Sequence, residues 1–165
     1  MNRHLYSGGA GLLLLIFGLM LVTSAFAAEQ ELFVSAGEAG IFRGPETAVF
    51  TIEYRPGFRV WKYVGFWLSG ESAFDEGYWI GAGFLLDIPI GSRWLIRPSF
   101  GGGYYHTTST FDLGSPLEFR SNFEVDFNIT HEWITGLALG HYSNGGITDQ
   151  NPGAETLRLL VGRRF

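Results

Sequence analysis

Hydrophobic and polar residues alternate along most of this chain with a period of two, which is the spacing of a β-strand whose faces meet different surroundings. The clearest run covers residues 117–129, where nearly every odd position is apolar and every even position carries a charged or amide side chain. A helix repeats every 3.6 residues and could not sort these side chains onto two faces. The pattern therefore predicts a strand.

The same alternation recurs in eight segments separated by turn residues. The predicted strands lie around residues 32–34, 50–54, 64–68, 78–88, 94–104, 117–129, 132–143 and 154–165. An even number of strands fits a closed antiparallel barrel. The later segments also have the roughly 10 residues with which a tilted strand crosses a bilayer.

The composition of the two faces distinguishes a membrane barrel from a soluble eight-stranded barrel or sandwich. Glycines recur on the polar face, at positions 65, 81, 83, 101, 103, 136, 140 and 162, and small residues suit the narrow interior of such a barrel. Bulky aromatic residues then face lipid, with several near strand ends, where interfacial girdles form. These are Tyr54, Trp61, Tyr63, Tyr78, Trp94, Tyr104 and Trp133.

The chain is thus predicted to be all-β, an eight-stranded antiparallel transmembrane β-barrel of the bacterial outer membrane. Its final strand, which ends in Phe165 after alternating apolar residues, resembles the terminal strand of bacterial outer-membrane proteins. Inside the barrel, buried charges need partners. We expect Arg97, Arg120 and Arg158 to pair with Glu118, Glu124 and Asp126. The interior is too narrow for an aqueous pore, which argues against transport.

The first 27 residues have the features of a cleaved secretory signal peptide. Arg3 and His4 precede an apolar run at residues 10–22, and Ala25-Phe26-Ala27 forms a small-x-small cleavage site. The barrel domain is then residues 28–165. Without Arg3, 10 Lys and Arg residues remain against 16 Asp and Glu, a net charge of −6 with no basic run. Nucleic acid is therefore an unsuitable partner.

A histidine, a serine and a carboxylate stand at the ends of the last two predicted strands. His141 and Ser143 are two residues apart, so their side chains leave the same face of one strand about 6.5–7 Å apart at the backbone. Glu155 begins the next strand on the corresponding face. Parity groups all three with Leu137, Leu139, Leu157 and Leu159. This arrangement supplies the nucleophile, base and orienting carboxylate of a serine hydrolase on a lipid-facing wall.

This region resembles the lipid A 3-O-deacylase (PagL-type) family of outer-membrane enzymes. The shared pattern is His-x-Ser-Asn-x-Gly followed by Asn-x-Gly-x-Glu, met here from His141 to Glu155. The strand Leu117-Glu118-Phe119-Arg120-Ser121 is also similar to that family. The resemblance implies release of the ester-linked 3-hydroxyacyl chain at position 3 of lipid A. The substrate would be lipopolysaccharide in the outer leaflet, where ten residues of strand from Glu155 to Phe165 place the site.

The residues around Ser143 are candidates for stabilising the oxyanion of such a reaction, because backbone and amide N–H groups serve this purpose. They are Asn144, Gly145, Gly146 and Asn151. No metal-ligand pattern is present, and the chemistry needs no cofactor. Two alternatives stay open. One is a non-enzymatic structural or adhesive barrel, and the other is a lipid-modifying barrel with an interior acyl pocket, such as a phospholipase or palmitoyltransferase.

Overall fold

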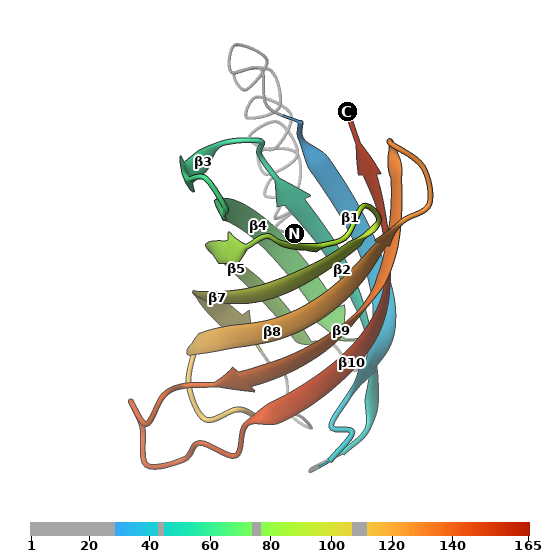
Figure 1. Cartoon of the computed structure of the whole chain (residues 1–165). Coiled ribbons are helices and arrows are strands. Elements are labelled where there is room, and N and C mark those ends of the chain that lie inside the picture. Colours follow the sequence, from blue (N-terminus) through green and yellow to red (C-terminus); the bar gives the residue numbers. More distant parts are fainter. Residues whose placement is uncertain (1–28, 43–44, 74–76, 107–111) are drawn as a thin grey trace, which may run out of the picture.

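The computed structural model describes residues 29–42, 45–73, 77–106 and 112–165, so the predicted signal peptide lies outside the described residues. Within them, eight long strands form an antiparallel barrel that closes where β1 pairs with β10 (Figure 1). Two short strands, β3 (Arg59–Trp61) and β6 (Ile88–Ile90), pair with β4 and β7. The long strands are β1 (Glu31–Ala39), β2 (Thr47–Arg55), β4 (Val64–Ala73), β5 (Gly77–Leu86), β7 (Trp94–His106), β8 (Leu117–Asn128), β9 (Trp133–Ser143) and β10 (Ala154–Arg164).

The eight predicted strands are confirmed. The fourth is shorter than predicted, since it ends at Leu86 and the chain turns into β6. None of the described residues forms a helix long and apolar enough to cross a membrane.

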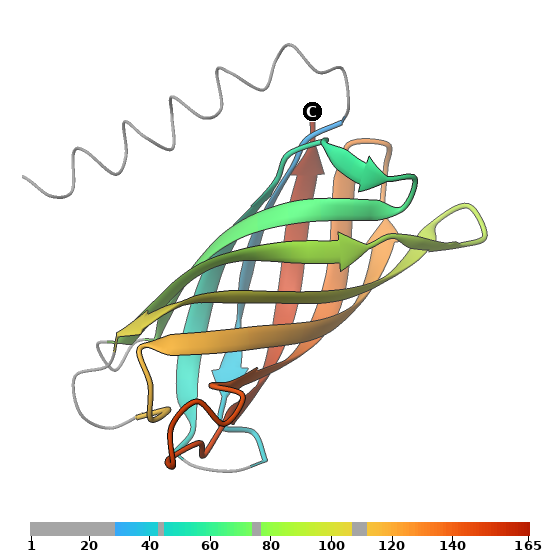
Figure 2. The same ribbon diagram turned by 90° about the vertical axis from the view of Figure 1, so that its left-hand side faces the viewer.

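The two ends of the barrel differ in their connections. Gln30 and Phe165 exchange backbone hydrogen bonds at one end, where residues 129–132 form a short turn. The opposite end carries the ten-residue connection 144–153, which Figure 2 shows below the strands. Outer-membrane barrels have short periplasmic turns and longer extracellular loops. We therefore call the end with residues 144–153 the outer end.

Side chains alternate strictly between the outside and the inside of the barrel. On β9, Leu137 and Leu139 are exposed on the outer surface, while Ala138 and Gly140 are buried. On β10, Leu157 and Leu159 are exposed and Arg158 is buried. An apolar exterior around a charged interior is the reverse of a soluble barrel, and it confirms the predicted membrane-facing arrangement.

Arginines bridge the interior of the barrel. Arg120 on β8 donates to Glu53 on β2, on the opposite wall, and Arg55 on β2 donates to Glu124 on β8. Arg97 binds Asp126 on the neighbouring strand at 2.8 Å and Glu31 across the barrel at 2.9 Å. All of these charged side chains are buried. Each depends on its partner, because an unpaired buried charge is strongly destabilising.

The predicted ion pairs are confirmed only for Arg97 with Asp126. Arg120 pairs with Glu53, and Arg158 pairs with Glu71 at 3.1 Å and with Asn122. The difference arises because the narrow interior lets a long arginine side chain reach the opposite wall. Within the described residues Glu118 forms no ion pair, although it is fully buried.

The interior also holds large aromatic rings, contrary to the expectation that bulky aromatics face lipid. Phe33, Trp67, Trp79 and Tyr142 are buried. The glycines on the inner face make room for them: a Cβ on Gly83 or Gly101 would overlap the ring of Trp67, and one on Gly81 or Gly103 would overlap Trp79. The girdle prediction is confirmed for Trp61, Tyr63, Tyr78, Trp94, Tyr104 and Trp133, which are exposed, whereas Tyr54 is buried.

The packing of glycine against tryptophan can be tested by adding a single methyl group. Gly83→Ala would place a Cβ against the carbonyl oxygen of Phe100 and 2.6 Å from Cζ2 of Trp67. We expect it to lower the free energy of unfolding by about 1–3 kcal/mol, the usual cost of overpacking. Urea unfolding in lipid vesicles would measure this. Gly70→Ala is the matched control, because nothing lies within 4 Å of its Cβ position; an equal loss in both variants would contradict the packing argument.

Candidate active site

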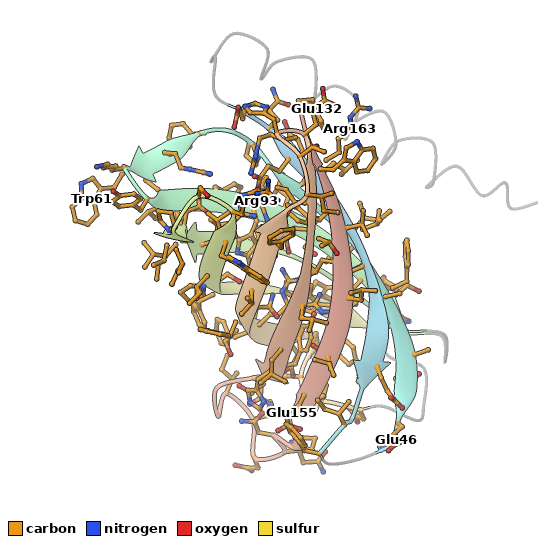
Figure 3. The ribbon with its side chains drawn as sticks, turned by 45° about the vertical axis from the view of Figure 1, so that its right-hand side comes forward. Glu46, Trp61, Arg93, Glu132, Glu155 and Arg163 are labelled. Carbon is orange, nitrogen blue, oxygen red and sulfur yellow. The ribbon has the colours of Figure 1, made fainter. Side chains whose placement is uncertain are left out.

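The hairpin of β9 and β10 brings His141 and Glu155 together. These two residues are direct partners in the strand register, so their side chains leave the same outer face of the barrel. Nδ1 of His141 lies 3.6 Å from Oε1 of Glu155, an ion-pair contact longer than a good hydrogen bond. Glu155 is labelled at the outer end of the barrel in Figure 3, opposite the end that carries Glu132 and Arg163.

The imidazole is also positioned by Gly153, the residue just before β10. Gly153 has a φ of 68°, and a Cβ there would lie 3.0 Å from Cε1 and 3.6 Å from Nε2 of His141. The ring thus presents Nδ1 to Glu155, and its opposite edge lies close to Gly153. Gly153 and Ser143 are the residues immediately beyond the Ala154–Tyr142 pair. Nε2 therefore lies toward Gly153, at the end of the hairpin strands where Ser143 ends β9.

Ser143 shares the outer face with His141 and is half-buried. Its neighbour across the sheet on β8 is Phe119, whose ring stacks on Phe100 with centroids 5.8 Å apart and planes at 12°. A Cβ on Gly145 would lie 3.4 Å from the Phe119 ring, so the loop after Ser143 rests on this aromatic pair. Phe119 was not among the predicted site residues, although its odd position on β8 places it on the outer face.

The loop that follows Ser143 is held by the side chain of Asn144, which is fully buried. Nδ2 of Asn144 donates to Oγ1 of Thr148 at 2.8 Å and to the carbonyl oxygen of Gln150 at 2.7 Å. Its Oδ1 accepts the N–H of Gly146 at 2.9 Å, and its own backbone N–H donates to Oδ1 of Asn151 at 3.0 Å. Both ends of this amide are thus occupied in shaping the loop.

These bonds separate the four oxyanion candidates into two pairs. The N–H groups of Asn144 and Gly146 are engaged within the loop. Among the described residues, neither the N–H of Gly145 nor the amide nitrogen of Asn151 donates a hydrogen bond. Gly145 has a φ of 66°, a conformation that glycine adopts without strain. In this arrangement Gly145 and Asn151 are the donors that a bound anion could use.

The surroundings of the site are apolar on the side toward the middle of the barrel. Leu139 and Leu157, the outward neighbours of His141 and Glu155, are 44% and 47% exposed and face the membrane. Within the described part of the chain, no group of three or more His, Asp or Glu side chains is placed to hold a metal ion. The cluster thus places a serine hydroxyl, an imidazole and a carboxylate at the outer edge of a lipid-facing wall.

Residues 47–164 match the family model described as lipid A 3-O-deacylase (PagL). The chain is similar to the lipid A deacylase PagL of Bordetella bronchiseptica, with 31% identity over 77 residues. That match covers 46% of this chain and 43% of the relative, so the chain spans less than half the length of this relative.

Among solved structures, the outer membrane enzyme PagL superposes with a TM-score of 0.60 at 17% identity, covering 80% of this chain and 97% of that one. Neisserial surface protein A superposes with a TM-score of 0.62 at 12% identity, covering 83% and 96%. A de novo designed transmembrane β-barrel gives 0.59 at 8% identity, covering 84% and 96%.

These superpositions show the barrel fold alone, because the designed barrel fits as well as the enzyme does. The family model is more specific, since it covers most of the chain and includes β9, β10 and the loop between them. The chain therefore belongs to the lipid A 3-O-deacylase (PagL) family of bacterial outer-membrane β-barrel proteins.

Proposed function

We propose that this protein is a serine esterase of the outer membrane that removes the ester-linked 3-hydroxyacyl chain at position 3 of lipid A. The observation that carries the proposal is the direct pairing of His141 with Glu155 on the outer wall, two residues from Ser143. The family and the name of the Bordetella bronchiseptica relative, lipid A deacylase, support the substrate.

In the proposed mechanism, Oγ of Ser143 attacks the ester carbonyl while Nε2 of His141 takes its proton. Glu155 accepts the Nδ1–H of His141, which fixes the tautomer and stabilises the imidazolium. The N–H of Gly145 and the amide of Asn151 stabilise the oxyanion. Collapse of the tetrahedral intermediate breaks the ester bond, and His141 returns its proton to the departing sugar hydroxyl. Water, deprotonated by His141, then attacks the acyl-serine; collapse of this intermediate breaks the bond to Oγ of Ser143, His141 returns the proton to Oγ, and the fatty acid is released.

The filled interior favours access from the membrane over an interior acyl pocket. Trp67, Trp79 and the arginine bridges occupy the space that an acyl chain would need inside the barrel. An acyl chain of a lipid in the outer leaflet can instead reach Ser143 along the exposed Leu139 and Leu157 without leaving the bilayer. The alternative of a phospholipase or palmitoyltransferase with an internal pocket is therefore disfavoured.

Removing the nucleophile should abolish activity without unfolding the barrel. Ser143→Ala deletes one oxygen at a strand end, and we expect the rate to fall by roughly 10⁴-fold or more, as for other triad members. Release of fatty acid from lipid A by purified protein would measure it, with heat-modifiable gel mobility as the check on folding. Ser121→Ala is the matched control: Ser121 faces His141 from β8 but has no loop N–H donors beside it. If Ser121→Ala lost activity and Ser143→Ala kept it, the nucleophile would lie on β8 and the proposed assignment to Ser143 would be wrong.

The product should be a single 3-hydroxy fatty acid, with the amide-linked chains left in place. A serine nucleophile without a metal suits esters better than the less reactive amides of lipid A. Mass spectrometry of lipid A before and after incubation would show the loss of one hydroxyacyl group. Loss of phosphate or of an amide-linked chain would contradict the assignment.

The shape of the loop should depend on Asn144. Asn144→Ala removes the hydrogen bonds from the buried amide to Thr148, Gln150 and Gly146, each of which contributes about 0.5–1.5 kcal/mol. We expect faster proteolysis within residues 144–153, together with reduced activity and an intact barrel. Gln150→Ala is the control, because Asn144 binds the backbone carbonyl of that residue and the variant keeps it. Equal proteolysis of the two variants would contradict the role of Asn144.

A further inference from the structure

Three aromatic side chains gather on the outer rim of the barrel, away from the proposed triad. Tyr78 is the second residue of β5, and Tyr104 and His106 lie in the last three residues of β7. The ring of Tyr78 lies 5.2 Å from the ring of His106 and 6.3 Å from that of Tyr104, measured between centroids. Tyr78 and Tyr104 are 41% and 52% exposed, and His106 is also exposed. All three rings combine an apolar face with a polar atom that can donate or accept a hydrogen bond.

This rim cluster, Tyr78, Tyr104 and His106, belongs to the same continuous surface as Ser143. Tyr104 is the register partner of Leu117 on β8, and Phe119, two residues further on, is the partner of Ser143. Because β7, β8 and β9 are adjacent, Tyr104 and Ser143 stand on strands about 10 Å apart across the sheet. Leu117 and the Phe119–Phe100 pair cover the space between them.

The charges of the rim decide in which direction a substrate headgroup would extend from Ser143. Lipid A is a phosphorylated glucosamine disaccharide, so its headgroup is anionic. Toward β1 and β2, the described rim carries the exposed carboxylates of Glu38 and Glu46 next to Glu155. Like charges repel, so this direction is unfavourable. Toward β7 and β5, among the described residues, the rim presents the uncharged tyrosines of the cluster and the imidazole of His106, and its exposed carboxylate is Asp112 in the connection between β7 and β8.

The chemistry of the cluster fits a sugar better than an acyl chain. One face of a pyranose ring exposes C–H groups that pack against the electron-rich face of an aromatic ring. The sugar hydroxyls can then bind the Tyr hydroxyl groups and the His106 nitrogens. An acyl chain would leave these polar atoms without partners. The outward residue next to them on β5, Ile80, is purely apolar and suits a chain or a lipid instead.

We propose that Tyr78, Tyr104 and His106 form a saccharide subsite that holds the second glucosamine of the substrate while the ester of the first lies at Ser143. The subsite rests on the proposed function, since it presupposes hydrolysis at Ser143. It makes the protein selective for acylated disaccharides over monosaccharides that carry the same ester bond.

The test compares the KM values of the purified protein for two substrates in detergent micelles. One is lipid A, and the other is an acylated glucosamine 1-phosphate with the same ester-linked chain. We expect Tyr104→Ala and His106→Ala each to raise KM for lipid A about 5- to 10-fold, the change that one aromatic contact of ordinary strength produces. The same variants should leave KM for the monosaccharide unchanged. Tyr104→Phe, which keeps the ring, should lose less than Tyr104→Ala.

Ile80→Ala is the matched control. Ile80 is the register partner of Tyr104 and is exposed on the same face, but its side chain has no aromatic ring and no polar atom. It should leave both KM values unchanged.

An equal rise in KM for both substrates, or a rise in Ile80→Ala as large as in Tyr104→Ala, would overturn the subsite and show a general contact with lipid. A deacylated glucosamine disaccharide should inhibit the wild type competitively and Tyr104→Ala more weakly. Equal inhibition of the two would also overturn it. Wild-type protein that hydrolyses neither substrate would refute the proposed function itself, a result distinct from these.

Discussion

The narrow interior of an eight-stranded barrel is the constraint on which the rest of this structure depends. Such a lumen must be filled by side chains, and every charge within it must find a partner. Arginines that reach from wall to wall, such as Arg120 to Glu53, satisfy the second condition. Tryptophans lying over glycines satisfy the first. Because the alternation of a strand is strict, fixing the inner residues also fixes which residues face the membrane.

The position of the candidate site follows from this filled interior. Because side chains fill most of the interior, the candidate reactive groups stand on the outer wall and in the loops. The β9–β10 hairpin uses both. Strand register sets His141 against Glu155, and the buried amide of Asn144 shapes the loop that offers the N–H of Gly145. Strands thus hold the proposed base and its carboxylate, and the proposed oxyanion donors lie in a loop that is held by its own hydrogen bonds.

Much of this arrangement could be predicted from the sequence, because period-two alternation is local information. The strands and the outward face of His141, Ser143 and Glu155 follow from parity, whereas the direct register pairing of His141 with Glu155 is set by the hairpin. The partners of Arg120 and Arg158 could not be predicted, since they come from strands distant in the chain. The inward position of Trp67 was detectable in principle, because it lies on the same face as Gly65 and Ser69. Nothing in the sequence distinguished the N–H of Gly146, which donates to Asn144, from that of Gly145, which donates to no described residue.

The placement of the site on the outer wall also determines how a substrate would be encountered. A molecule reaches Leu139 and Leu157 by moving within the plane of the leaflet, so the relevant concentration is a number per unit of membrane area. Diluting the substrate with other lipids would then slow the encounter even at a constant amount per volume of suspension. Tight lateral packing of the surrounding lipids would slow it as well. The lipid composition and lateral packing of the bilayer would thus limit the turnover rate without any change in the protein.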